Sequence, residues 1–497
     1  MNRVSMSTND AVKSANAEIE QFGYKQELKR RLTYADLLIY GLIFMVPIAP
    51  FAIFGSVFQA SGGMVALAYL VGMAGMMLTA NAYRYMAQEY PMSGSVYTYV
   101  GRSIARPVGF VAGWMILLDY ILIPTLLYTA AAMALQGLVP AVPIWLWVVV
   151  FVVLNTVINC LGIEFTAGAN KIMLVLELIV LAIFLVIGFV AVAQGKGQGF
   201  NFSAFFNPGH FSVSVIFGAV SIAVLSFLGF DGISTLAEEN TSGPKAVGRS
   251  MIAALALLGV LFVVQTWVAT MLTPLDKSAD LIANGDPAGS AFYDAAGLAG
   301  GNFLFVTTSV ATAIAWGFAN ALAAQAATSR LLFAMARDRQ LPHILARVSS
   351  KRGVPVAATF LVAIVSLVLG VFFVLLPDGL GTISTMVNFG ALTAFLLLNV
   401  TMVWHFAIKG KHPRIFGHIV VPVLGAIVLA FVLWNARIAA QTVGLIWLGA
   451  GIVLAIVLYR LGRMTDPMQQ SQGQTPQGAS PETSPSGMDM SQAERDM

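Results

Sequence analysis

The sequence predicts an all-α polytopic membrane protein with twelve transmembrane helices. Of its 497 residues, 58% are hydrophobic and only 10% are charged, whereas soluble globular chains carry about 25% charged residues. So few charges cannot cover a soluble particle of this size, and the remaining apolar surface must face lipid. Two further observations support this fold: the apolar residues form runs of membrane-spanning length, and the basic residues lie on one side of those runs.

A transmembrane helix needs about 20 mostly apolar residues, and twelve such runs follow one another along the chain. They must be helices, because lipid offers the backbone no hydrogen-bond partners and the runs are too long and too uniform for barrel strands. The expected spans are 35–58, 64–83, 108–137, 144–162, 172–193, 212–237, 250–273, 302–329, 355–376, 382–408, 415–436 and 441–459.

The distribution of Lys and Arg predicts the orientation of these spans. Twelve spans place both termini on one side. If that side is the cytoplasm, only three of the 27 basic residues fall outside, namely Lys196, Lys277 and Arg437. If the number of spans were wrong by one, the basic residues would be distributed over both sides of the membrane. Their one-sided distribution therefore supports twelve spans. We expect a multi-pass protein of a plasma (bacterial inner) membrane with both termini cytoplasmic.

Polar segments flank the membrane domain. Residues 1–33 are expected to form a cytoplasmic N-terminal segment without a cleavable signal peptide, and 34–462 the transmembrane domain. Residues 463–497 are rich in Gln, Ser, Pro and Asp, which predicts a disordered cytoplasmic tail. The single cysteine, Cys160, excludes an internal disulfide.

The sequence contains no nucleotide-binding Gly-rich loop with its lysine, no hydrolase triad and no zinc signature. The five histidines show no metal-binding spacing. We therefore predict that the protein is not an enzyme, needs no cofactor or metal, binds no nucleic acid and does not itself hydrolyse ATP.

The first span is interrupted by two prolines, Pro47 and Pro50. They remove two N–H donors and free the carbonyls four residues earlier, those of Ile43 and Val46. Such a break survives at membrane depth only if it is buried in protein or lines a cavity. A purely structural kink is the alternative.

The sixth span is interrupted at Gly229 and Gly232, which flank Asp231. Breaks in the first and sixth spans occupy corresponding places if five helices are followed by an inverted copy of the same five. Paired broken helices are a sequence sign of a transporter's binding site at the membrane midplane.

At this point the chain resembles the amino acid–polyamine–organocation transporters, over about residues 28–460. Three motifs carry the resemblance, in order along the chain: Y-P-M-S-G-S-V-Y-T-Y-V at 90–100, S-F-L-G-F-D-G-I-S-T-L-A-E-E at 226–239 and S-R-L-L-F-A-M-A-R-D-R-Q-L-P at 329–342. Within that family it looks most like bacterial putrescine importers, through Gly113-Trp114, Leu118-Asp119-Tyr120 and the Pro-rich first span.

The resemblance implies a five-plus-five inverted-repeat fold of the leucine-transporter type with two additional helices. It also implies alternating access around a midplane site between the first and sixth helices, with walls from the third, eighth and tenth. Neither the repeat nor this mechanism follows from composition or spacing alone.

One departure from the family pattern points to the substrate. Amino acid carriers of the family typically show a Gly-x-Gly-Ile-Phe-Gly-like stretch whose exposed N–H groups receive the substrate carboxylate. Here the matching stretch is Pro50-Phe51-Ala52-Ile53-Phe54-Gly55, and only the last glycine remains. The site has lost anion donors and, through its prolines, gained carbonyl acceptors. We therefore expect a substrate with ammonium groups and no essential carboxylate.

Three acidic residues lie deep in the spans: Asp119, Glu177 and Asp231. No Lys or Arg lies near mid-span to neutralise them, and intramembrane charges are functional candidates because they are costly to insert. Burial disfavours the charged form of a carboxylate, so each is also a candidate proton carrier.

Each of the three has an alternative role. Asp231, which matches the family's acidic position in the sixth helix, could bind a substrate ammonium, carry a proton, or cap the freed backbone. Asp119 and Tyr120 could hold an ammonium beside the Tyr120 carbonyl freed by Pro124, or Asp119 could be a protonated packing residue. Glu177 lies near the family's lysine in the fifth span, which implies a proton site, but it could instead serve packing or face lipid.

The remaining candidates are polar or aromatic side chains in the first, sixth, eighth and tenth spans, for which packing is the alternative in every case. Glu238 and Glu239 could form an inner gate with Arg330 or Arg337, or simply be a solvated helix end. The full set of predicted substrate-binding residues is Val46, Pro47, Ile48, Asp119, Tyr120, Phe227, Phe230, Asp231 and Asn320.

The sequence thus predicts a secondary active importer of a polyamine or similar organic cation, putrescine-like and proton-coupled. An amino acid permease, working as a symporter or an exchanger, is the alternative. A membrane sensor or channel is the alternative from a different functional class.

Overall fold

The computed structural model describes residue 28 and the ranges 30–139, 141–161, 163–286, 289–350, 352–376, 379–410, 414–436 and 438–462. Most of the predicted N-terminal segment and the whole predicted tail from 463 lie outside the described residues. In the described part every regular element is a helix, apart from one isolated bridge between Leu32 and Asn240. The prediction of an all-α polytopic protein is confirmed.

The twelve predicted spans each have a counterpart among the described helices. Eleven are long and apolar enough to cross a membrane, and a bent pair makes the twelfth. In order they are α2–α3 (Tyr34–Met45, Pro50–Ser61), α4 (Val65–Glu89), α6 (Arg106–Leu138), α7 (Ile144–Leu161), α8 (Ile163–Ala193), α9–η1–η2 (Val213–Ala223, Val224–Phe227, Phe230–Glu239), α10 (Pro244–Leu272), α12–η3–α13 (Ala291–Ile314, Ala315–Asn320, Ala321–Arg337), α14 (Val356–Val374), α15–η5 (Gly379–Val403, Trp404–Lys409), η6–α16 (Ile415–Val420, Val421–Trp434) and α17 (Ile438–Arg460).

The segment between the predicted spans 250–273 and 302–329 is partly helical. It contains the helix α11 (Leu275–Asn284), and the eighth span begins early, with α12 at Ala291. A kink separates the early part of α12 from the rest, because Gly301 takes a positive φ of 68°. Two further short elements, α5 (Ser95–Ser103) and η4 (His343–Ala346), lie in the connections after the second and eighth spans.

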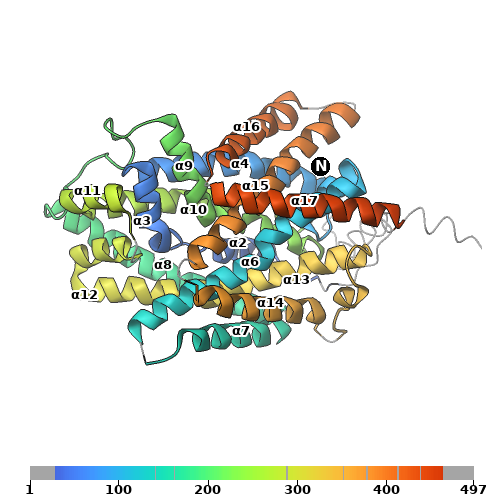
Figure 1. The fold of residues 1–497 in the computed structure, drawn as a ribbon, viewed down its shortest axis with the longest axis horizontal. Coiled ribbons are helices and arrows are strands. Elements are labelled where there is room, and N and C mark those ends of the chain that lie inside the picture. Colours follow the sequence, from blue (N-terminus) through green and yellow to red (C-terminus); the bar gives the residue numbers. More distant parts are fainter. Residues whose placement is uncertain are drawn as a thin grey trace, which may run out of the picture. The chain divides into compact units, whose positions relative to one another are not determined.

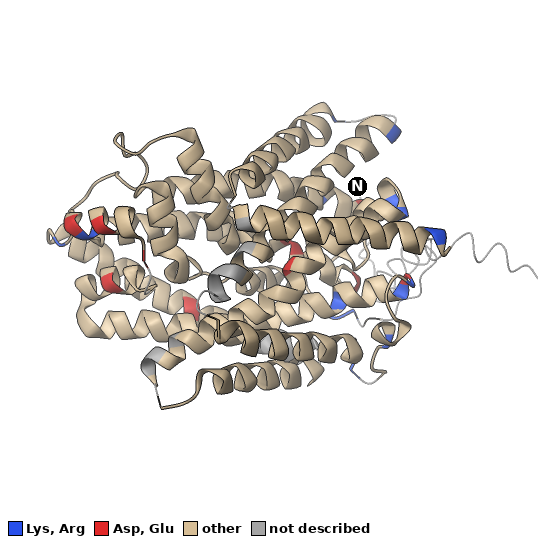
Figure 2. Ribbon diagram, viewed as in Figure 1, with Lys and Arg blue, Asp and Glu red and all other residues tan. Residues whose placement is uncertain are grey.

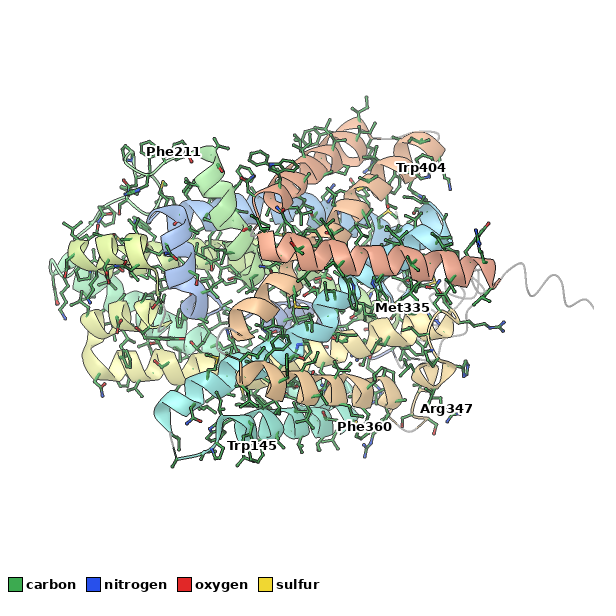
Figure 3. The ribbon with its side chains drawn as sticks, in the orientation of Figure 1. Trp145, Phe211, Met335, Arg347, Phe360 and Trp404 are labelled. Carbon is green, nitrogen blue, oxygen red and sulfur yellow. The ribbon has the colours of Figure 1, made fainter. Side chains whose placement is uncertain are left out.

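The long helices lie side by side, with apolar side chains on their outward faces (Figures 1 and 3). Trp145 on α7 and Phe360 on α14 point outward (Figure 3) and are about half exposed. An exposed apolar face of this kind suits a lipid environment.

The charged residues gather at the two ends of the bundle (Figure 2). Lys and Arg concentrate at one end, whereas Asp and Glu mark the end that carries α11, and a few acidic residues lie between the two ends. This separation is the spatial counterpart of the partition of basic residues along the sequence.

Backbone hydrogen bonds join the segment before the first span to the end of the sixth span. The N–H groups of Arg31 and Leu32 donate to the Glu239 carbonyl at 2.9 and 3.0 Å, and the Thr241 N–H donates to the Leu32 carbonyl at 2.8 Å. Lys171 of α8 forms an ion pair with Asp36 of α2 at 2.6 Å. The backbone bonds hold the start of the first broken helix against the end of the sixth.

Candidate functional site

The first span is broken between Met45 and Pro50, and its two halves are bent by 53°. Val46 lies at the bend with φ 56° and ψ 108° and is fully buried. A β-branched residue with positive φ is a genuine outlier, and such strain persists only where surrounding structure imposes it. The two prolines predict an interruption of the first span, and the structure has one whose central residue is fully buried.

The backbone groups at this break are mostly occupied, which corrects one detail of the sequence interpretation. The Ile43 and Val46 carbonyls accept local turn bonds from the N–H groups of Val46 (3.2 Å) and Ala49 (2.9 Å). The Pro47 carbonyl accepts from the Gln265 side chain at 3.0 Å. These carbonyls therefore already have donors, because the chain folds into a tight turn where the helix is interrupted.

Some of the N–H groups at the start of α3 are likewise missing or already bonded. Pro50 has none, and the Phe51 N–H donates to the Ile48 carbonyl at 3.0 Å. A helix N-terminus binds anions through its free N–H groups, and two of the first donors of this helix are therefore unavailable to a carboxylate.

The sixth span is broken at Leu228 and Gly229. Leu228 is extended, with ψ 140°, and Gly229 takes φ 108°. Only glycine adopts this conformation without strain. A side chain at Gly229 would also collide with Phe44, whose ring and carbonyl would lie within 3 Å of its Cβ. The short helix η2 begins just after the break and carries Asp231 in its first turn.

Asp231 is fully buried and is held by Tyr120 of the third span. The Tyr120 hydroxyl donates to one carboxylate oxygen at 2.5 Å, while the other oxygen has no hydrogen-bond partner among the described residues. This hydrogen bond brings together Tyr120 and Asp231, two predicted binding residues that lie 111 positions apart in the sequence.

Asp119, the neighbour of Tyr120, is also fully buried. Neither of its carboxylate oxygens has a hydrogen-bond partner in the described part of the chain. The Tyr120 carbonyl freed by Pro124 is already engaged, because the Thr328 hydroxyl donates to it at 2.6 Å. The Tyr120 carbonyl is therefore not available to a substrate ammonium group, and only the carboxylates of Asp119 and Asp231 remain as its partners.

A small pocket lies beside the two breaks. Apolar side chains of the first, third and sixth spans make most of its wall, and Ser226, Trp316 and Asn320 are its polar members. The Trp316 indole nitrogen and the Asn320 amide oxygen are buried and have no partner among the described residues. Trp316 and Asn320 both lie on η3, a π-helical turn in the eighth span, and π turns are frequent at functional sites.

Phe44 connects this pocket to the carboxylates. Its ring lines the pocket and lies 6.4 Å from the Tyr120 ring, between centroids. Gly229 and Gly232 press against the same ring, since a Cβ on either would collide with it. Phe44, which the sequence did not single out as a binding residue, therefore contacts the pocket, Tyr120 and both glycines beside Asp231.

Two predicted aromatic residues lie elsewhere. Phe227 packs between Tyr69 and Phe262, with ring centroids at 6.0 and 5.2 Å. Phe230 packs against Tyr83 and Phe395, at 5.6 and 5.5 Å. Neither is among the residues that line the pocket. Both belong to aromatic packing, the alternative that an aromatic-rich chain makes the default.

Glu177 lies on the buried stripe of α8. It is 4% exposed, and the stripe continues at helical spacing through Leu174, Leu181 and Phe184. Neither of its carboxylate oxygens has a partner among the described residues. The lipid-facing alternative is therefore excluded. Its helix α8 packs against α12, α10 and α2 and, less extensively, against the π turn η3.

Glu238 and Glu239 form ion pairs with both arginines that the sequence offered. Glu239 is fully buried and bonded to Arg330 through two nitrogens, one of them at 3.3 Å. Glu238 accepts two bonds from Arg337, at 2.9 and 3.1 Å, and a third from the Ser93 N–H at 2.9 Å. The solvated helix end is excluded, since neither glutamate side chain is exposed.

Other polar residues of the eighth and tenth spans mainly join helices. Asn159 donates to Gln325 at 2.8 Å, and Gln325 donates to Thr156 at 2.9 Å. Asn388 donates to the Ser221 carbonyl at 3.2 Å. Within the described residues, no three His, Cys, Asp or Glu side chains are grouped closely enough to hold a metal ion.

Comparison with known families gives a match along nearly the whole membrane domain. A family model described as amino acid permease matches residues 35–459. The low-affinity putrescine importer of Escherichia coli (strain K12) is 30% identical over 445 residues, which cover 86% of this chain and 93% of the importer.

Two further relatives come from Bacillus subtilis (strain 168). A branched-chain amino acid permease is 26% identical over 469 residues, covering 88% of this chain and 94% of its own. A methylthioribose transporter is 26% identical over 471 residues, with the same coverage. The relatives thus share a membrane-transport role, but their names give three chemically different substrates.

Proposed function

We propose that this chain, which belongs to the amino acid permease family within the amino acid–polyamine–organocation transporters, imports a polyamine-like organic cation by proton symport. The family makes it a multi-pass membrane transporter of a small molecule. Substrate, coupling ion and direction are our proposal, as is the assignment of 34–462 to a transport domain with both termini in the cytoplasm.

The observation that carries the proposal is the buried pair of carboxylates at the broken sixth helix. Asp119 and Asp231 are fully buried, and three of their four oxygens have no partner in the described part of the chain. Buried charges require pairing, and no Lys or Arg side chain forms an ion pair with either carboxylate among the described residues. A substrate ammonium supplies the missing positive charge, with Tyr120 holding Asp231 in place.

The apolar lining of the neighbouring pocket favours an aliphatic amine. Ile123, Leu126 and Leu127 of α6 and Leu225 of the sixth span supply apolar surface suited to a chain of methylene groups. The unpartnered Asn320 oxygen provides an acceptor for a second amine. At the start of α3, Pro50 has no N–H and the Phe51 N–H is already bonded to the Ile48 carbonyl, which leaves fewer donors for a carboxylate.

We further propose that Glu177 holds the coupling proton. A buried carboxylate without partners is stable in the membrane when protonated, and it must release the proton when water or a cation reaches it. Its helix contacts α2 and η3, two elements beside the first break and the pocket, so its protonation can respond to movement of the first span.

The substitution Glu177→Gln tests this assignment. It imitates the protonated form permanently, so exchange of external for internal substrate should persist, while accumulation driven by an imposed proton gradient should fall at least tenfold. Counterflow and gradient-driven uptake in the same proteoliposomes measure the two. Glu89→Gln, the same change at a half-exposed glutamate, is the matched control. An unchanged response to the proton gradient in Glu177→Gln removes Glu177 from this role.

The ion pairs at the end of the sixth helix act as the inner gate in this proposal. They join the half-helix η2 to the eighth span through Glu239–Arg330 and Glu238–Arg337. Alternating access then requires these pairs to part when the site opens to the cytoplasm.

The decisive experiment for the function is uptake into liposomes that contain the purified protein under an imposed proton gradient. Labelled putrescine and its α-amino acid counterpart, ornithine, are compared. The proposal predicts concentrative uptake of putrescine and weak uptake of ornithine. A clear preference for ornithine would establish the alternative, an amino acid permease, which the branched-chain permease among the relatives and the apolar pocket wall also support.

A further inference from the structure

The loop between the fifth and sixth spans, residues 194–212, carries aromatic side chains that are not part of the transport pocket. It contains five phenylalanines and neither Asp nor Glu. A cluster of exposed large apolar side chains marks an interaction surface. We call the four that are at least 45% exposed the phenylalanine patch: Phe200, Phe202, Phe206 and Phe211. Phe211 projects from the side of the bundle (Figure 3).

The patch lies beside the end of a spanning helix rather than beyond it. Phe200 and Phe202 pack on Trp267 of α10, with ring centroids at 5.4 and 5.2 Å. Trp267 lies five residues before Leu272, where α10 ends, which is about 7–8 Å along the helix axis. The loop therefore folds back along the bundle to the level of the last helical turns.

The patch continues the lipid-facing surfaces of α8 and α10. On α10, Val260 is exposed and lies about two turns before Trp267, on the same face. On α8, Val186 and Val190 are exposed. Phe189, which lies between them in the sequence, has its ring 6.3 Å from that of Trp267. Lipid covers apolar faces of this kind in a membrane-spanning chain, so the same lipid reaches the phenylalanines.

Backbone groups of the loop are bonded to the spanning helices. The Asn201 carbonyl accepts from the Trp267 indole N–H at 2.8 Å. The Ala204 carbonyl accepts from the Leu67 N–H, at the start of α4, at 3.1 Å. Unpaired backbone groups are costly next to lipid, and these bonds remove that cost while the phenylalanine rings stay exposed.

The charge pattern separates this loop from the other long segment at the same end of the bundle. The segment 274–300 carries four aspartates, and α11 within it has no buried residue, as suits contact with water. The loop 194–212 has no acidic residue. Acidic side chains are repelled by anionic headgroups and are costly near the apolar layer, so their absence favours a lipid neighbour.

We propose that the loop 194–212 inserts its phenylalanine patch into the boundary between headgroups and acyl chains, in the leaflet at the α11 end. The partner of this surface is the phospholipid itself. Exposed aromatic rings bind that boundary by burying apolar area to a depth of about 5–10 Å, which matches the level of Trp267. The inference is independent of the substrate and the coupling ion.

The test places a fluorophore on the patch of the full-length protein in lipid nanodiscs, where water reaches both faces of the membrane. Cys160 is the only cysteine, so Cys160→Ser gives a parent chain, and Phe200→Cys adds one site for an NBD label. We expect blue-shifted emission, weak quenching by aqueous iodide and strong quenching by lipids spin-labelled near the headgroup end of the acyl chain. Lipids spin-labelled near the methyl end should quench at least about twofold less. Phe206→Cys should behave in the same way.

Two matched labels set the scale of this measurement. Asp280→Cys, at an exposed position of α11, should be quenched by iodide and not by the spin-labelled lipids. Val260→Cys, near the middle of α10 on its exposed face, should be quenched most by lipids labelled near the methyl end. Patch labels that behave like the Asp280 label or like the Val260 label overturn the proposal. Protection from iodide without quenching by either lipid also overturns it, because protein then covers the patch.

Discussion

The substitution Asp231→Asn is expected to abolish concentrative uptake, with a loss on the order of 100-fold or more, while the protein still inserts and folds. The amide keeps the size of the side chain and its bond with Tyr120, whose hydroxyl lies 2.5 Å from the carboxylate. It removes only the charge that pairs with the substrate. An unpaired buried charge costs about 3–5 kcal/mol, and each 1.4 kcal/mol is tenfold in affinity.

Two further variants sharpen this test. Tyr120→Phe leaves the carboxylate but removes its hydrogen bond, so we expect a smaller loss, expressed mainly as a weaker apparent affinity. Asp280→Asn makes the same chemical change at an exposed position of α11 and should transport normally. Uptake rates are normalised to the amount of protein in the membrane. Robust accumulation by Asp231→Asn would exclude a binding or coupling role for this residue.

The second large effect is expected at the buried ion pair of the gate. Arg330→Met should lower the stability of the protein by about 3–5 kcal/mol, because it leaves the fully buried Glu239 without its partner. The measurement is the thermal unfolding midpoint in detergent, which should fall by several degrees. Arg347→Met, at an exposed arginine, should leave the midpoint unchanged.

The double variant Arg330→Met with Glu239→Met distinguishes a buried charge from a lost contact. Replacing both partners removes the uncompensated charge, so most of the lost stability should return. The double variant should also leak substrate in the absence of a proton gradient if the pair closes the inner end. Equal destabilisation in the single and double variants would show that packing, rather than charge, dominates at this position.

The fold was readable from the sequence because the bilayer allows few alternatives. Lipid requires every spanning segment to satisfy its own backbone, so length and hydropathy were enough to place twelve helices, from 35–58 to 441–459. The breaks were equally visible, since proline removes N–H donors and glycine takes conformations that other residues avoid. Pro47 and Gly229 mark both of them.

The early start of the eighth span was not predictable in the same way. The segment from 274 to 300 contains four aspartates, which lowers its hydropathy, although α11 and the start of α12 are helical there. Polar helices outside the apolar core of a membrane carry no hydropathy signal. Their helical state depends on packing against neighbouring elements.

Among the functional residues, the sequence determined which types are costly in a membrane and are therefore candidates: Asp119, Glu177, Asp231 and the glutamates at the end of the sixth span. Only the tertiary structure decided how they are paired. It showed that Tyr120 donates to Asp231, that Arg330 pairs with Glu239 and that Arg337 pairs with Glu238. It also showed that the Glu177 carboxylate has no partner among the described residues and that Phe227 packs between two aromatic rings. The physical reason is that insertion cost depends on residue type and depth, which sequence records, whereas pairing depends on which faces of distant helices meet.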